Sequence, residues 1–263
     1  MSDVLGIINC GIYAEDVSQD EEQYALENGW IKLESPKYND TWCQGRQTRI
    51  KNSELIYNKK IRKMLDPCHN IESCVKRLDE CDKNELKTVY EQYIKIKSNQ
   101  YKQSDEIFAD FYTHDDFFND LLIDPDYKKI IEYRENGKLH AFVICRTYEK
   151  TNAITSIQFC WDYHKPKIFL GKYSCVKEIE MCIDEGREYL YLGCGYENMC
   201  FYKSMYKGFE WWTGSEWSSD REAYRTLCRT DTSTKDIYEL GQLEEEYTGK
   251  FFFSPKEIKN RQK

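Results

Sequence analysis

Residues 169–193 read FLGKYSCVKEIEMCIDEGREYLYLG, and this stretch decides the fold. Its middle part predicts an amphipathic helix of about four turns, because apolar residues recur at three-to-four spacing with charged residues between them. Gly186 is a stop signal for that helix, and residues 189–192 predict a short buried strand that ends at Gly193. A strand-like run precedes the helix. Strand, helix and strand with short joints predict two parallel strands that lie side by side.

Two β-branched and aromatic runs precede this unit, KLHAFVICRTYE and AITSIQFCWDY. A short polar link separates them, which predicts an antiparallel hairpin. A hairpin followed by strand–helix–strand is the order of the GNAT acyltransferase fold, in which the two parallel central strands splay apart and the acyl donor lies in the gap. We therefore predict an α+β, GNAT-like fold: a mixed sheet with splayed parallel central strands, preceded by a small N-terminal module.

The composition narrows the class of protein. The chain has 263 residues, with a hydrophobic fraction of 40% and an aromatic fraction of 15%, which is enough apolar surface for a core. No run of about 18 apolar residues occurs, so we expect no membrane-spanning helix and no membrane partner. The first residues lack the cationic start of a secretory signal, which favours a cytoplasmic protein. The 12 cysteines are scattered, and we expect most of them to be buried small hydrophobes rather than disulfides.

Two boundaries divide the chain. Asp66-Pro67 is a break signal, so residues 1–66 are expected to form a small N-terminal module with a basic segment. Residues 67–230 are expected to form the GNAT-like domain. Residues 231–263 carry no interpretable motif and are expected to form a tail that docks on the body through the three phenylalanines at 251–253.

The basic segment is prominent because the whole chain is acidic, with a net charge of −8. Between residues 46 and 63 there are seven cations and one anion, a local charge of +6 that leaves −14 for the rest. Such a segment can bind phosphates. A solvated basic helix face fits the same spacing equally well.

Short motifs then follow one another in a fixed order. They are Trp161-Asp162-Tyr163, Leu170-Gly171-Lys172-Tyr173-Ser174, Lys177-Glu178-Ile179, Tyr189-Leu190-Tyr191-Leu192-Gly193, Cys200 and Lys203-Ser204-Met205-Tyr206-Lys207-Gly208. Each motif is weak alone, but together they resemble the C-terminal half of the aminoacyl-tRNA–protein transferases, both the arginyl-transferases and their bacterial leucyl-transferring relatives. With weaker matches in the N-terminal module, the resemblance runs from about residue 10 to residue 217.

The resemblance implies a reaction in which a free α-amine attacks the ester that joins an amino acid to the 3′ end of tRNA. The ester is already activated, so no covalent enzyme intermediate is needed. An α-amine titrates at about 7.7–8.0, so it needs only modest help from a base. Charged tRNA and the N-terminus of an acceptor protein are the implied partners, and positioning with oxyanion stabilisation is the main task.

The matched motifs give candidate site residues. Asp162, at the end of the central strand, is the expected catalytic carboxylate, although an Asp in this position can also cap a turn. Ser174 is the second catalytic candidate, because Gly171 to Ser174 open a helix whose free N–H groups could hold an oxyanion or phosphate. The substrate-binding candidates are Gly171, Lys172, Tyr173, Glu178, Gly193, Glu197, Tyr206 and Lys207. The tRNA-binding candidates are Arg46, Arg49, Lys59, Lys60 and Arg62.

The four histidines, His69, His114, His140 and His164, are scattered and are interpreted as surface or structural residues. No cofactor is expected beyond aminoacyl-tRNA as co-substrate. Only Cys10 and Cys43 match the cysteines of the family's eukaryotic members, and two thiolates fall short of the four that a zinc or iron–sulfur site needs, so no metal site is expected.

An arginine donor is favoured over leucine, because Asp162, Glu178 and Glu197 are carboxylates that suit a guanidinium group. The implied acceptor then has an acidic N-terminus. Three alternatives stay open: leucyl transfer, modification of a dedicated peptide or small molecule by the same chemistry, and a non-catalytic adaptor with a GNAT fold. Acetyl-CoA-dependent acetylation is disfavoured, because the strand–helix connection DYHKPKIFLGKYS lacks the glycine-rich pyrophosphate loop.

Overall fold

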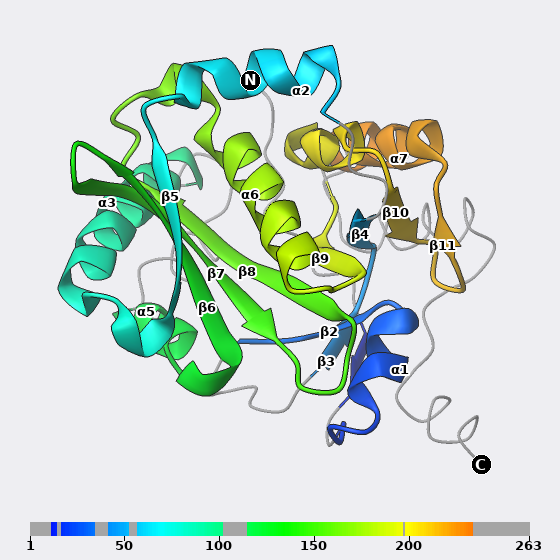
Figure 1. The fold of residues 1–263 in the computed structure, drawn as a ribbon. Coiled ribbons are helices and arrows are strands. Elements are labelled where there is room, and N and C mark those ends of the chain that lie inside the picture. The colour runs from blue at the N-terminus through cyan, green and yellow to red at the C-terminus, as the bar shows by residue number, and fades with distance from the viewer. Residues whose placement is uncertain are drawn as a thin grey trace. The chain divides into compact units, whose positions relative to one another are not determined.

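The computed structural model describes residues 12–14, 17–34, 42–52, 57–101, 115–196 and 198–233 (Figure 1). They fall into two compact units. Unit 1 draws on Met1–Lys51, Glu149–Thr151 and Tyr191–Lys263, and unit 2 draws on Asn52–Tyr148 and Asn152–Leu190.

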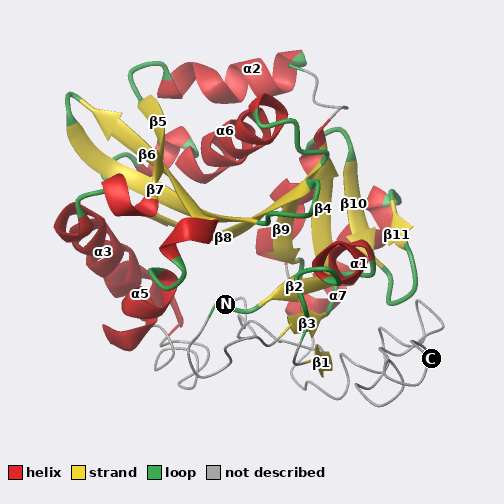
Figure 2. Cartoon of the chain, turned by 60° about the horizontal axis from the view of Figure 1, so that its bottom comes forward, coloured by secondary structure: helices red, strands yellow, loops and turns green. Residues whose placement is uncertain are grey.

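Unit 2 is built on four strands in the order β5-β6-β7-β8, each antiparallel to the next. Helices α3 and α5 cover one face of these strands, and α6 covers the other with α2 packed beside it (Figure 2). The strands are β5 (Glu72–Arg77), β6 (Lys128–Glu135), β7 (Lys138–Thr147) and β8 (Ala153–Trp161). The helices are α2 (Lys59–Leu65), α3 (Lys83–Tyr101), α5 (Asp115–Leu121) and α6 (Leu170–Asp184), with 3-10 turns η3 (Asp66–Cys68), η4 (Leu78–Glu80), η5 (Pro125–Tyr127) and η6 (Pro166–Ile168).

Strand β7 is the centre of this unit. All of its residues from Leu139 to Arg146 are buried, because helices cover the sheet on both faces. The predicted hairpin of β7 and β8 is confirmed. A second hairpin joins β6 to β7 through Asn136 and Gly137, which both have positive φ, the geometry of a type I′ turn.

The predicted helix and the strand after it are also confirmed. Helix α6 buries nine side chains, and the chain leaves it at Gly186, whose φ of +67° suits glycine. Strand β9 (Tyr189–Cys194) follows, and from Tyr191 onward it belongs to unit 1.

Unit 1 combines segments from both ends of the described chain. Strands β1 (Ile12–Ala14) and β2 (Trp30–Lys32) flank β3 (Trp42–Gln44) in a small sheet. The others follow the order β11-β10-β4-β9, with β4 (Gln47–Lys51), β10 (Phe209–Trp212) and β11 (Trp217–Ser218). Its helices are α1 (Glu22–Glu27), the 3-10 helix η7 (Asn198–Met205) and α7 (Arg221–Ser233).

The pairing of β4 with β10 explains why unit 1 joins segments from both ends of the described chain. The two strands run antiparallel, with Ile50 opposite Phe209 and Thr48 opposite Trp211. Residues near 50 therefore share a core with residues near 210, more than 150 positions further along the chain. The expected domain division stays a prediction, and the tail from residue 234 on lies outside the described residues.

The α+β class with a mixed sheet and packed helices is confirmed. None of the 11 described cysteines forms a disulfide, and eight of them are buried, as the composition suggested. Among the described helices, none is both long and apolar enough to cross a bilayer.

Candidate functional site

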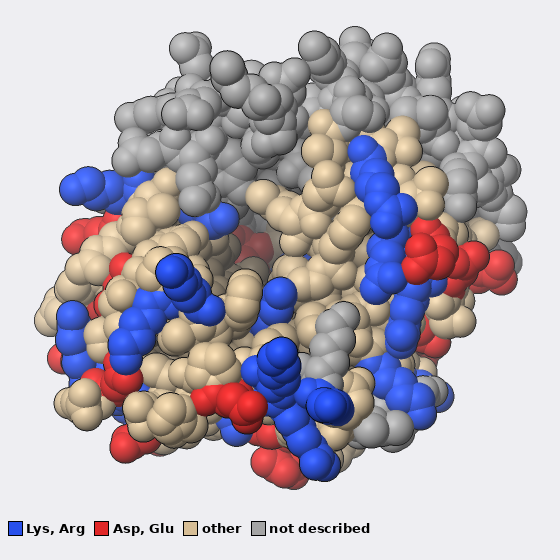
Figure 3. Space-filling view, turned by 90° about the horizontal axis from the view of Figure 1, so that it is seen from above, with Lys and Arg blue, Asp and Glu red and all other residues tan. Residues whose placement is uncertain are grey.

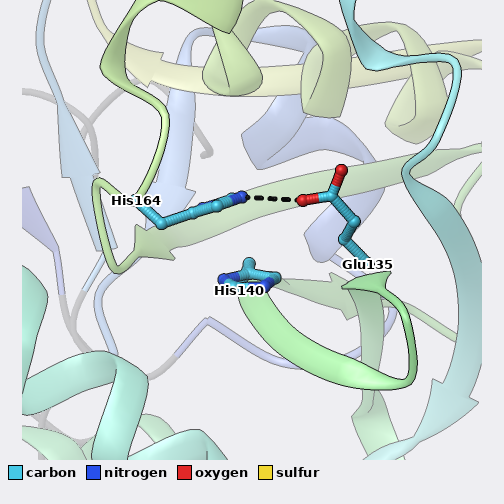
Figure 4. A group of neighbouring side chains, drawn as sticks. All are labelled: Glu135, His140 and His164. Carbon is cyan, nitrogen blue, oxygen red and sulfur yellow. Dashed lines mark hydrogen bonds and ion pairs between the residues drawn. The ribbon is translucent and has the colours of Figure 1, made fainter.

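Four titratable side chains lie together in unit 2: Glu135, His140, Asp162 and His164. Figure 4 draws Glu135 and the two histidines, whose ligand atoms lie within 4.8 Å of one another. The two imidazole rings stack, with 3.6 Å between their centroids. We call these four residues the imidazole–carboxylate cluster.

Local backbone features of two strands present the first pair. Glu135 ends β6, and His140 stands three residues after the turn glycine Gly137. Arg134 pairs with Leu139 and Tyr133 pairs with Ala141, so His140 is the extra residue of a β-bulge. Bulges redirect side chains at strand ends, and this one places His140 at the same hairpin end as Glu135.

The turn after β8 supplies the second pair. The backbone N–H of Asp162 donates to the carbonyl oxygen of His140 over 2.9 Å. Tyr163 then takes a left-handed conformation with φ of +55°, which costs a non-glycine residue on the order of 1 kcal/mol. Its ring packs at a tilt against Trp161, with centroids 4.2 Å apart. The turn brings the backbone N–H of His164 back to Oδ1 of Asp162 at 3.0 Å.

The carboxylate of Asp162 is hydrogen-bonded to the Nδ1 atom of both imidazoles. Nδ1 of His140 lies 2.7 Å from its Oδ2, and Nδ1 of His164 lies 2.9 Å from its Oδ1. Burial raises the pKa of Asp162, but the hydrogen bonds from His164 and His140 outweigh it and hold the pKa below its usual value. An ionised carboxylate only accepts hydrogen bonds, so both Nδ1 atoms carry the hydrogen. In the neutral rings, Nε2 is therefore the nitrogen with a free lone pair.

Glu135 lies on the Nε2 side of His164. Its Oε2 is 3.4 Å from that nitrogen, and Nζ of Lys165 lies 2.5 and 2.6 Å from its two oxygens. The ion pair with Lys165 lowers the pKa of Glu135, so the carboxyl is ionised near neutral pH. The cluster thus combines two oriented imidazoles with a second carboxylate, and it could accept a proton or bind a cation.

Ser174 lies in a different environment. It is fully buried in α6; its hydroxyl accepts a hydrogen bond from Tyr133 at 2.9 Å and donates one to Glu178 at 2.8 Å. Glu178 is also buried, at 3% exposure. Burial, and then the nearby charge of Glu178, raise the pKa of Tyr133 well above its usual value. This network fixes α6 against β6.

The other three candidates at the start of α6, Gly171, Lys172 and Tyr173, each lie in a different environment. A Cβ on Gly171 would touch the ring of Phe159 at an ordinary 3.5 Å, so neither space nor backbone demands glycine there. Lys172 is half-buried with its ammonium over the ring of Phe169, 4.5 Å from the centroid. Tyr173 is buried and donates a hydrogen bond to the carbonyl of Ile71.

The expected residues from Gly193 onward lie in unit 1. Gly193 has φ of +72° and open space where a Cβ would be, so it is the backbone conformation that requires glycine. Buried Lys203 donates to the carbonyls of Leu192 and Cys194, on either side of Gly193. Tyr206 is buried and Lys207 is exposed. Glu197 lies outside the described residues.

The expected tRNA-binding residues separate into two environments. Arg46 is fully buried in unit 1 and pairs with Asp231 at 2.5 Å, and Arg49 pairs with Glu210 at 2.7 Å and lies over Trp217. In unit 2, Lys59 and Arg62 are exposed on α2, and the side chain of Lys60 is not among those described. Figure 3 views the chain from the side of α2 and shows several lysines and arginines on that face. Among the candidates whose side chains the structure describes, Lys59 and Arg62 are the ones presented to a polyanion without breaking an ion pair such as those of Arg46 and Arg49.

The sequence interpretation missed His140, His164 and Glu135. The Asn136-Gly137 dipeptide was the available signal, because it predicts a hairpin that brings residues 135 and 140 to one end. His164 stands two residues after the expected Asp162, at the spacing of a side-chain turn.

Comparison with protein families gives one match. Residues 85–213 match the family described as "Arginine-tRNA-protein transferase, C terminus". Residues 85–213 belong to this family. The matched region contains the whole imidazole–carboxylate cluster and the Ser174 network.

Several solved structures are similar in fold. One is the C-terminal domain of a putative lysylphosphatidylglycerol synthetase from Agrobacterium fabrum, with 14% identity and a TM-score of 0.44, covering 70% of this chain and 54% of that chain. Another is L-PGS from Bacillus licheniformis, with 10% identity and a TM-score of 0.43, covering 90% of this chain and 64% of that one. A third is a GCN5-related N-acetyltransferase from Kribbella flavida, with 11% identity and a TM-score of 0.34, covering 66% of this chain and 54% of that one. A sequence search of curated proteins gave no match.

Proposed function

We propose that this protein transfers an aminoacyl group, with arginine as the favoured donor, from charged tRNA to the N-terminal α-amine of proteins that begin with an acidic residue. The observation that carries the proposal is the match of residues 85–213 to the arginine-tRNA-protein transferase C terminus. Charged tRNA as co-substrate fits the cytoplasmic location that the sequence favoured.

The proposed chemistry is direct aminolysis. The amine nitrogen attacks the ester carbonyl carbon, a C–N bond forms, and the C–O bond to the terminal ribose breaks. The amine loses a proton and the ribose oxygen gains one. A positioned imidazole can move that proton, an effect that is typically worth about 10²–10⁴-fold in rate.

The imidazole–carboxylate cluster supplies such a group. Asp162 fixes the hydrogen on Nδ1 of both rings, which leaves Nε2 of His140 or His164 to accept the amine proton and return it to the ribose oxygen. In this proposal Asp162 positions the two imidazoles. It does not bind the donor's ammonium group, because both of its oxygens accept hydrogen bonds from the histidines.

The proposed preference for arginine as the donor amino acid rests on the family match, and not on carboxylates that could bind its guanidinium group. Asp162 is bonded to imidazoles, and Glu178 is buried against Ser174, so neither supports a guanidinium pocket. Lys172 or the exposed Lys207 is the cation proposed to meet an acidic acceptor residue, and Lys59 and Arg62 are proposed to meet tRNA phosphates.

The test supplies the full chain with tRNA charged separately with labelled arginine or leucine, and with peptides that begin with Asp, Glu, Arg or Leu. We expect label to move from arginyl-tRNA to the Asp and Glu peptides. Transfer only from leucyl-tRNA would overturn the donor, and transfer only to a dedicated peptide would overturn the acceptor. No transfer, together with no charged tRNA retained on a filter, would leave a non-catalytic adaptor.

A further inference from the structure

Two hydrogen-bond acceptors in the cluster, one on His164 and one on Glu135, lie close enough together to favour a cation between them. Nδ1 of His164 lies 2.9 Å from Oδ1 of Asp162, so the ring presents its Nε2 on the other side, toward Glu135. In the neutral ring Nε2 then presents a lone pair, and it lies only 3.4 Å from Oε2 of Glu135. Two acceptors at this distance repel each other unless a proton or a metal ion lies between them.

The groups also have the chemical identity of metal ligands. Two neutral imidazoles and one carboxylate form one of the sets that hold Zn²⁺ at sites with an open fourth position. A ligating histidine nearly always gives its other ring N–H to a carboxylate or carbonyl. Asp162 does this for both rings at once.

We propose that Nε2 of His140, Nε2 of His164 and the carboxylate of Glu135 form a binding site for a divalent cation of the Zn²⁺ class, with Asp162 orienting both imidazoles. This departs from the sequence-based expectation that the chain has no metal site, which considered cysteines alone. It needs no thiolate and lies entirely within unit 2.

The geometry is close to what an ion requires. One candidate ligand atom from each of the three residues lies within 4.8 Å of the others, and in a tetrahedral zinc site the ligand atoms lie about 3.3 Å apart, so a closing movement of at most about 1.5 Å is needed. The side chains of His140, His164 and Glu135 are only 10%, 17% and 11% exposed, which limits competition from water. Lys165 is the cation that now balances Glu135, and its side chain is 47% exposed, so it can move into solvent when the ion binds.

Metal binding and proton acceptance exclude each other here, because both use the Nε2 lone pairs. A bound ion is therefore expected to inhibit aminoacyl transfer, and this consequence alone rests on the proposed function. The binding itself can be measured without any activity.

The test titrates Co²⁺ into the full chain after treatment with a chelator, and records visible ligand-field absorption, followed by displacement with Zn²⁺. We expect saturation at about one equivalent, loss of the signal in His140→Ala and His164→Ala, and about 10–100-fold weaker binding in Asp162→Asn. His69→Ala removes an exposed histidine outside the cluster and is expected to bind like the wild type.

Three outcomes would overturn the inference. The first is a Co²⁺ signal that persists in both histidine variants. The second is a thiolate charge-transfer band, which would place the ion on cysteines. The third is no absorption in a chain whose circular dichroism is native, which would mean that a proton alone separates His164 from Glu135.

Discussion

Nδ1 of His140 lies 2.7 Å from Oδ2 of Asp162, and this bond joins the first residue position after β8 to a bulge in β7. It fixes the tautomer of His140, and the matching bond to Oδ1 fixes that of His164. Both oxygens of the carboxylate that was expected to face the substrate are therefore hydrogen-bonded to imidazoles.

Replacing Asp162 by Asn tests that relationship. The amide keeps the shape, and its oxygen is expected to stay on the side of the backbone N–H of His164, so its NH2 group would donate to Nδ1 of His140. The hydrogen of that ring would move to Nε2, which removes His140 as the proton acceptor. We expect the single-turnover rate of transfer to fall by about 100-fold or more with an unchanged circular dichroism spectrum. A rate within a factor of two of wild type would show that the tautomer does not matter.

Replacing Ser174 by Ala separates stability from catalysis. The hydroxyl satisfies Tyr133 and Glu178 in a fully buried network, so its loss should cost about 1–3 kcal/mol of unfolding free energy in urea. The transfer rate of the folded variant should change little. Ser219→Ala, at an exposed serine, is the control and should change neither quantity. A large fall in rate at unchanged stability would restore the catalytic role expected from the sequence.

Replacing an exposed basic residue should affect tRNA binding, whereas replacing a buried one should affect stability. Arg62→Ala on α2 should weaken tRNA binding and lower the salt slope of the binding constant by about one, with native stability. Arg46→Met should instead remove the guanidinium that lies 2.5 Å from the carboxylate of the buried Asp231, at a cost of about 3–5 kcal/mol. Filter binding across a salt series and urea unfolding measure the two effects, and the account fails on this point if Arg46→Met changes only the salt slope.

The ionisation of Glu132 should make the free energy of unfolding depend on pH in the acidic range. Burial pushes its pKa up, but hydrogen bonds from Arg134 and Lys76 outweigh burial and hold the pKa below 4.5. Its contribution is therefore complete above about pH 4.5 and is lost as pH falls through the folded-state pKa. Glu132→Gln should be less stable than wild type at pH 7 and should lose less unfolding free energy between about pH 5 and pH 3. Equal losses in the two proteins would contradict this, and Glu72→Gln, at an exposed position on β5, serves as the control.

Local patterns predicted the elements that carry the site. The three-to-four spacing in residues 170–184 gave α6, and the β-branched runs gave the β7–β8 hairpin. The cluster itself escaped prediction, because it depends on a bulge at His140 and a left-handed Tyr163, which no periodicity encodes. The burial of Arg46 was not predicted for another reason: its ion-pair partner, Asp231, is 185 residues away in the sequence.

The most direct test of the central claim is a single-turnover measurement of label transfer from arginyl-tRNA to a peptide with N-terminal Asp. It compares wild type, the double variant His140→Ala/His164→Ala and the control His69→Ala. The account predicts rapid transfer by wild type and the control, and a rate at least about 100-fold lower in the double variant with tRNA binding retained. Equal rates in the three proteins would contradict it, because the proton would then leave the amine without either imidazole.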